Sequence, residues 1–147
     1  MSIAIVMLPA FALSQAPSVL SGSAIQTAQN PARIKADAEM QQALRTGLTI
    51  KSVSAPELDG TYLLDSDNQM DPTTMVLYIR EFNAFPGGLR QYPWPDKTGK
   101  IHLIPNILTA IAFFRAIADY TAALDTAYNV ELAGGVPTWP KQPIVIR

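Results

Sequence analysis

The chain of 147 residues lacks cysteine, has a single histidine and carries almost no net charge. Without cysteine it has no disulfide framework, no thiolate nucleophile and no thiolate metal site. Eleven basic and twelve acidic residues give a net charge of −1, so the basic surface typical of nucleic-acid binding is missing. We therefore expect no nucleic-acid partner, and the cysteine count does not indicate a compartment.

Charge is missing altogether from residues 1–32, because the first charged residue is Arg33. Pro9, Pro17 and Pro31 interrupt this segment. Its larger apolar side chains are those of Ile3, Ile5, Val6, Met7, Leu8, Phe11, Leu13, Val19, Leu20 and Ile25. Ordering its backbone costs more free energy than burial of these side chains returns. We therefore expect an extended N-terminal arm that neighbouring protein subunits hold.

Three other interpretations of this arm stay open to different degrees. A secretory signal needs basic residues at its start, and none precedes Arg33. A membrane span across residues 3–20 would contain two prolines and several polar residues, without basic or aromatic anchors. A disordered leader remains an alternative, and whether the arm is cleaved is open. We expect no membrane partner, since Arg115 and Asp119 also interrupt the apolar stretch nearer the C-terminus.

Three segments have the pattern of helices. Residues 30–47 and 71–82 each begin with Asn-Pro or Asp-Pro, a capping residue followed by a proline that fits the first turn. Gly47 predicts the end of the first helix. Residues 106–128 carry an apolar side chain every three or four positions, which predicts a long amphipathic helix.

Four short runs have the pattern of strands and predict two β-hairpins. Residues 48–53 pair with 61–64, and residues 89–94 pair with 101–104. The predicted fold is α+β, with both hairpins packed against the long C-terminal helix. We divide the chain into an uncharged N-terminal arm (1–32), an α+β domain (33–130) and an extended C-terminal tail (131–147). Residues 144–146 could add a final strand to a sheet edge.

His102 is the one side chain suited to act as a general base at neutral pH. It alternates with Ile101 and Leu103, so we expect it on the opposite face of its strand, either hydrogen-bonded or facing solvent. No Gly-x-Ser-x-Gly motif accompanies it. We expect no catalytic residues, and a hydrolase that uses His102 as its base is the weaker alternative.

Two loops resemble ligand-binding motifs only in part. Residues 65–71 look like the start of a calcium loop, but Met70 and Val76 occupy the positions that need glycine and glutamate. Asp71 therefore predicts a helix cap instead. Residues 97–100 hold the letters of a phosphate loop in the wrong order and predict a hairpin turn. We expect no metal and no cofactor.

Aromatic side chains gather near the second hairpin. Tyr92 and Trp94, with Phe85 close by, form a candidate ligand platform for a sugar or a peptide. Aromatic residues flanked by proline more often close a hydrophobic edge. An alternative function is accordingly a receptor- or glycan-binding module that uses Tyr92, Trp94 and Trp139.

The central part of the chain resembles small proteins encoded in phage and prophage structural clusters, particularly those of tail regions. The resemblance lies in residues 58–65, 78–79 and 94–102, followed by a helix with Phe114 and residues 118–120. It covers about residues 48–128 and consists of turns and aromatic residues. It implies a role in a virion or tail module, assembled in the host cytoplasm, without supplying active residues.

These observations predict a non-enzymatic virion structural protein, associated with a tail or a capsid. Its extended termini would join other virion subunits in a homo-oligomer or a hetero-assembly, for example by strand addition to a sheet edge. The candidate partner-binding residues are Ile3, Ile5, Val6, Leu8, Phe11, Leu13, Val19, Leu20, Trp139, Ile144 and Ile146.

Overall fold

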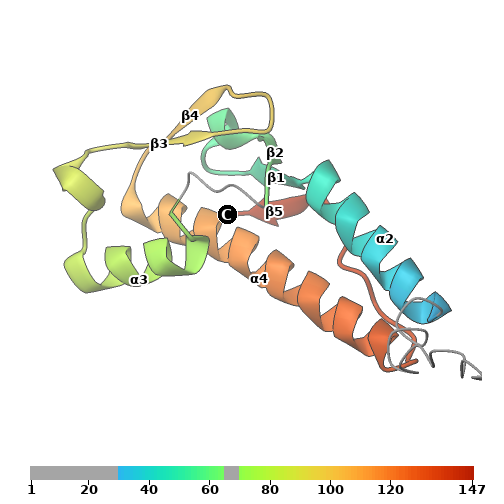
Figure 1. The fold of residues 1–147 in the computed structure, drawn as a ribbon. Coiled ribbons are helices and arrows are strands. Elements are labelled where there is room, and N and C mark those ends of the chain that lie inside the picture. Colours follow the sequence, from blue (N-terminus) through green and yellow to red (C-terminus); the bar gives the residue numbers. More distant parts are fainter. Residues whose placement is uncertain (1–29, 65–69) are drawn as a thin grey trace, which may run out of the picture. The chain divides into compact units, whose positions relative to one another are not determined.

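The computed structural model describes residues 30–64 and 70–147. The candidate partner-binding residues from Ile3 to Leu20 lie outside the described residues, as does most of the acidic loop 65–71. The described part is a mixed α+β domain with three α-helices, a three-stranded sheet and a two-stranded sheet (Figure 1). The predicted fold class is confirmed.

The helices begin where the capping residues predict. They are α2 (Pro31–Thr46), α3 (Pro72–Phe82) and α4 (Ile107–Leu132). The Asp71 carboxylate accepts a hydrogen bond from the Thr74 amide at 2.8 Å, so the predicted cap is confirmed. The Asn106 side chain caps α4 in the same way. The helix α4 continues to Leu132 instead of ending near residue 128, so the chain after it is shorter than the predicted tail.

Gly47 ends α2 in the left-handed conformation, with φ of 76°. Strand β1 (Leu48–Ser52) follows and runs antiparallel to β2 (Gly60–Tyr62), after the single-turn 3-10 helix η1 (Pro56–Leu58). Leu48 lies opposite Tyr62. The first predicted hairpin is confirmed, although β2 starts one residue early and ends at Tyr62.

The second predicted hairpin is also confirmed. It consists of β3 (Tyr92–Pro95) and β4 (Ile101–Ile104), which follow the 3-10 turn η2 (Pro86–Gly88). Trp94 lies opposite His102 in this pair. The proline-flanked strand β3 has only β4 beside it, which suits a strand whose prolines cannot donate hydrogen bonds.

The C-terminal strand β5 (Ile144–Ile146) lies parallel to β1, so the first sheet has the order β2-β1-β5. Ile146 is 7% exposed and belongs to the core. Gln142, just before β5, accepts a hydrogen bond from the Thr49 amide at 2.8 Å. The end of the tail is therefore part of this domain's own sheet, because β1 offers an edge that its hairpin partner leaves open.

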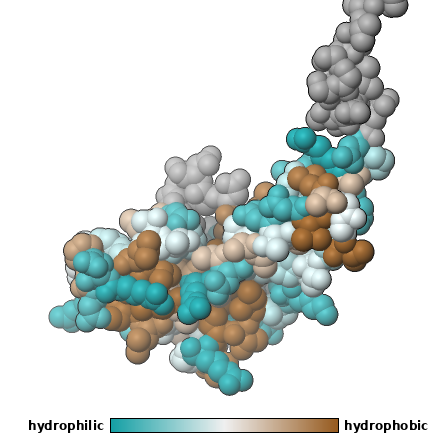
Figure 2. Space-filling model, turned by 90° about the horizontal axis from the view of Figure 1, so that it is seen from below, coloured by the Kyte–Doolittle hydropathy of each residue, from teal (hydrophilic) through white to brown (hydrophobic). Residues whose placement is uncertain are grey.

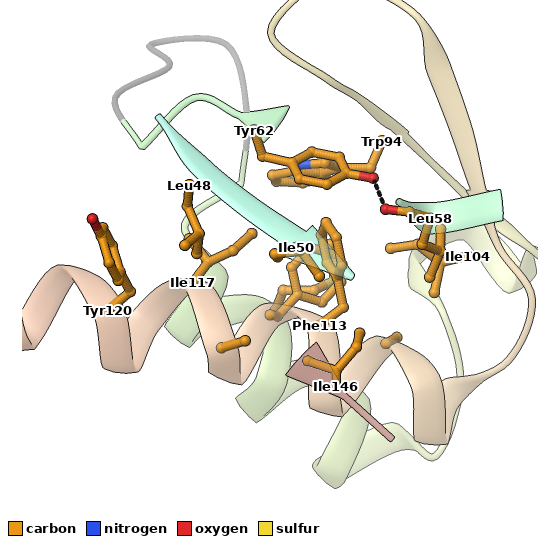
Figure 3. Packing of buried hydrophobic residues seen from close by; sticks show 14 of the residues in the cluster. Leu48, Ile50, Leu58, Tyr62, Trp94, Ile104, Phe113, Ile117, Tyr120 and Ile146 are labelled. Carbon is orange, nitrogen blue, oxygen red and sulfur yellow. Dashed lines mark hydrogen bonds between the residues drawn. The ribbon is translucent and has the colours of Figure 1, made fainter. Parts of the chain in front are cut away.

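The core lies between the sheets and α4, with α3 and α2 alongside α4 (Figure 1). Figure 3 shows Tyr62 and Trp94 above Phe113 of α4. The Tyr62 and Phe113 rings meet edge to face, with centroids 4.8 Å apart. The Tyr62 hydroxyl donates to the Leu58 carbonyl at 2.7 Å, and burial raises the pKa of Tyr62. This aromatic contact joins the first hairpin to the long helix.

Among the described residues, α4 is long and apolar enough to cross a membrane by length and composition. Core helices of globular domains have the same composition. Phe113, Phe114 and Ile117 on its inner face are buried by the rest of the domain. Arg115 and Asp119 lie on its exposed face as an ion pair at 3.5 Å. Packing within the domain therefore accounts for the hydropathy of α4.

Candidate functional site

His102 lies inside the domain, at the corner where the two hairpins meet. It is 3% exposed, whereas its neighbours Ile101 and Leu103 are 55% and 48% exposed. The prediction that His102 faces away from these two residues is confirmed, but the polar side chain is the inward one. Its Nδ1 lies 2.6 Å from the Glu57 carbonyl oxygen, and its Nε2 lies 3.1 Å from Asp96 Oδ2.

Both ring nitrogens of His102 face oxygen atoms of the domain, the Glu57 carbonyl on one side and the Asp96 carboxylate on the other. Asp96 is suited to its part as a carboxylate. Hydrogen bonds from Thr98, and then from His102, lower the pKa of Asp96. The other carboxylate oxygen also accepts from the Lys100 amide at 3.0 Å. This corner therefore holds an ionised carboxylate against an imidazole ring.

The His102 corner connects the two sheets. Just after Asp96, the Lys97 amide donates to the Thr61 carbonyl of β2 at 2.7 Å. The Lys97 ammonium donates to the Arg45 and Thr46 carbonyls at the C-terminal end of α2, at 2.6 and 3.2 Å. Basic groups stabilise such helix ends. The contacts of His102 and Asp96 therefore lie at a point where η1, β2, the second hairpin and α2 are joined.

The candidate ligand platform at Tyr92 and Trp94 is buried in part. Trp94 is 4% exposed and contacts Phe114 edge to face at a centroid distance of 4.9 Å. Tyr92 is half-buried and stacks on Phe85 at 5.6 Å. Burial raises the pKa of Tyr92. Trp94 thus fills space between the second hairpin and α4, whereas Tyr92 stays partly accessible, and the ligand platform remains a prediction.

Trp139, Ile144 and Ile146 are the C-terminal candidate partner-binding residues, and the structure places them in different environments. Ile144 and Ile146 pair with β1 of the same chain, and this pairing leaves them half-buried and buried. Val145, between them, is 56% exposed. Trp139 is half-buried and lines a groove. Of the three, Trp139 alone lines such a groove.

We name this groove the α2 groove. It lies between α2, the C-terminal half of α4 and the segment before β5, and its volume is about 410 Å³. Its lining includes Ala38, Ala43, Tyr120, Leu124, Trp139 and Pro140. Glu39 is the one charged residue among the described residues that line it. This groove is an apolar depression of ligand or peptide size.

A second groove of about 410 Å³ lies between α3 and α4, and we name it the α3 groove. Arg80, Arg115 and Asp119 line it, together with Leu77 and four small or half-buried residues. Leu77 is 61% exposed. Figure 2 shows the underside of the domain, where hydrophobic areas are divided by hydrophilic ones. The two grooves thus have the same volume and a different charge.

No group of three histidine or carboxylate side chains in residues 30–64 and 70–147 could hold a metal ion. The predicted turn at residues 97–100 is present at the tip of the second hairpin, where Gly99 has φ of 86°. Residues 65–69, which belong to the calcium-loop alternative, lie outside the described part.

Comparison of the chain with protein-family models, with curated proteins and with solved structures gave no match. The function of the chain therefore has to be inferred from its own residues.

Sequence reasoning missed the α2 groove and the link between His102 and Asp96. The link had a signal, because Asp-x-Thr-Gly is typical of a turn whose aspartate accepts local hydrogen bonds. The groove had no such signal, because its lining comes from three segments that are far apart in the sequence.

Proposed function

We propose that this chain is a non-enzymatic structural protein of a phage-like particle, in which the N-terminal arm joins neighbouring subunits. The observation that carries the proposal is the arm itself: residues 1–32 contain no charge and many apolar side chains. The phage-like setting rests on the resemblance of residues 48–128. The subunits it joins are other virion proteins, either copies of this chain or different ones.

The domain that follows the arm supports this division of roles. Residues Pro31–Arg147 form a compact unit with its own core. Ile144 and Ile146 already belong to this core sheet, so the proposal assigns the joining contact to the N-terminal arm. An arm of this kind gains affinity from backbone hydrogen bonds and from apolar side chains placed in pockets.

The environment of His102 favours a structural role over a hydrolytic one. Both ring nitrogens lie against acceptors within the domain, and the side chain is buried. A general base needs a nitrogen that can take a proton from substrate. Of the three aromatic residues in the glycan-binding alternative, Trp94 is buried in the core, whereas Tyr92 and Trp139 are half-buried.

Deletion of residues 2–28 tests the proposal. We expect the truncated chain to keep its cooperative thermal unfolding, measured by circular dichroism, and to lose incorporation into particles, measured by co-sedimentation. The double substitution Val6→Ser and Leu8→Ser should lower incorporation while the chain stays folded, because it removes apolar surface without adding charge.

The matched control is the double substitution Ser14→Ala and Ser18→Ala, which changes two polar positions of the same arm. We expect it to leave incorporation unchanged. Normal incorporation of the truncated chain would refute the proposed function.

A further inference from the structure

We infer that the α2 groove is the receptor for the N-terminal arm of a neighbouring copy of this chain. The inference rests on the proposed function and adds to it the surface that holds the arm. The α2 groove and the α3 groove are the candidates, because a third groove between the start of α3 and α4 is smaller, about 250 Å³, and is lined by Asp71 and Asp125. The charges of the two larger grooves decide between them.

The α2 groove matches an uncharged occupant. Glu39 is the one charged residue of its described lining, and this carboxylate already lies 3.6 Å from the ammonium of Lys35. The α3 groove is lined by Arg80, Arg115 and Asp119. Arg115 is paired with Asp119 at 3.5 Å, but an arm without charges would cover the Arg80 guanidinium without offering it an anion, which costs free energy. The uncharged segment therefore fits the α2 groove.

Two polar side chains of the α2 groove already form hydrogen bonds within the domain. Gln142 donates to the Gly47 carbonyl at 3.2 Å and lies 3.4 Å from the Tyr120 hydroxyl. Its oxygen accepts from the Thr49 amide. Apolar side chains can therefore cover Gln142 and Tyr120 without breaking these bonds. Trp139 Nε1, on the groove wall, is a buried donor without a partner among the described residues, so a backbone carbonyl of the arm could accept from it.

The proposed function favours a neighbour's arm over the chain's own, because in that proposal the arm joins one subunit to the next. The residues of α2 that line the groove lie between Ala38 and Thr46. The occupant is therefore assigned to a second copy of the chain, and the cross-linking experiment below distinguishes it from the chain's own arm.

The absence of cysteine allows a direct test by cross-linking. Full-length chains with Val6→Cys are assembled with full-length chains that carry Ala38→Cys, and a short bis-maleimide is added. Ala38 is exposed at the groove, so its substitution leaves the core intact. We expect a link between positions 6 and 38 of two different chains, identified by mass spectrometry of the joined peptides.

The matched control replaces Ala38→Cys with Ala122→Cys, an exposed alanine of α4 that lines the α3 groove. We expect at least tenfold less linkage to position 122. Equal or greater linkage to position 122 would overturn the inference. A link within one chain, seen when Val6→Cys and Ala38→Cys are combined and diluted among unmodified chains, would overturn it as well.

A pair of charge variants gives an independent measurement. We expect Ala38→Glu to lower assembly of the full chain at least tenfold, and Ala122→Glu to leave it unchanged, since both are exposed helical alanines. Deletion of the arm tests the proposed function separately from the assignment of the groove. If deletion blocks incorporation but no link to position 38 forms, the groove is wrong and the function stands; if the truncated chain is incorporated normally, the function is wrong.

Discussion

The two halves of α4 are held in the domain by different kinds of contact. Its N-terminal half lies under the hairpins, and its aromatic side chains form the centre of the core. Phe113 and Phe114 each contact Trp94, at centroid distances of 6.5 and 4.9 Å. Such ring pairs add to the free energy gained from burial itself. This half of the helix is fixed by close packing.

The C-terminal half of α4 is joined to α2 through small side chains and polar pairs. The Lys35 ammonium lies 2.6 Å from Glu131 Oε1, and the Tyr128 hydroxyl donates to Asp37 at 2.7 Å. The side chain of Glu131 is 6% exposed, and its second oxygen has no partner in the part of the chain described. The hydrogen bond with Glu131 raises the pKa of Lys35.

The two kinds of contact differ in how firmly they hold the helix. A core of interlocking rings tolerates little change in volume. The Tyr128–Asp37 pair is exposed, and exposed polar pairs contribute little free energy. The α2 groove lies beside this second kind of contact, between α2 and the C-terminal half of α4.

The sharpest test of the comparison is one truncation in the N-terminal half of α4 and one in α2, which packs along α4. We expect Phe113→Ala to lower the free energy of unfolding by about 3–5 kcal/mol, because it removes a fully buried ring. Met40→Ala, at a half-buried position of α2, should cost about 1–2 kcal/mol. Urea unfolding followed by circular dichroism measures both. Equal losses would show that the two halves are packed alike.

A smaller effect is expected at the end of α2. Gly47 has φ of 76°, and a Cβ placed there would lie 2.5 Å from the Tyr62 carbonyl oxygen. Gly47→Ala should therefore cost about 2–4 kcal/mol, from backbone strain and from the displaced strand. Gly99 has a similar φ with open space around it, so Gly99→Ala should cost only about 1 kcal/mol. If thermal unfolding shows the same shift for both, then the approach of β2 to Gly47 is not a constraint.

The smallest predicted effect is a change in how the free energy of unfolding depends on pH. It concerns Asp96, the partner of His102. The pKa of Asp96 is lower in the folded domain than its usual value, which is about 3.9. Its contribution to stability is therefore complete above that value and is lost as the pH falls. We expect Asp96→Asn to flatten the decline in unfolding free energy between pH 6 and the acid limit of folding, measured with urea. Parallel profiles for the two proteins would contradict this role.

Local signals in the sequence predicted most of the fold. The cap and proline at residues 71–72 fixed the start of α3, and the regular apolar spacing of residues 106–128 indicated α4. Both hairpins join neighbouring segments, so short-range patterns were sufficient for them. These features depend on a few adjacent residues.

Long-range pairing could not be predicted in the same way. Residues 144–146 have the pattern of a strand, but nothing in them specifies β1 as the neighbour. The groove around Trp139 includes the segment just before β5, so the sequence did not predict this groove either. His102 was predictable only in part. Alternation indicated that its side chain lies opposite Ile101 and Leu103, but did not indicate that it points into the domain, where its partners are Glu57 and Asp96.

The parallel position of β5 also has a consequence for synthesis on the ribosome. Thr49 and its side-chain partner Gln142 are 93 residues apart in the chain. While the nascent polypeptide emerges, β1 has its antiparallel neighbour long before it can acquire the parallel one. Its second edge stays open throughout that interval, so the completed sheet is a late product of translation.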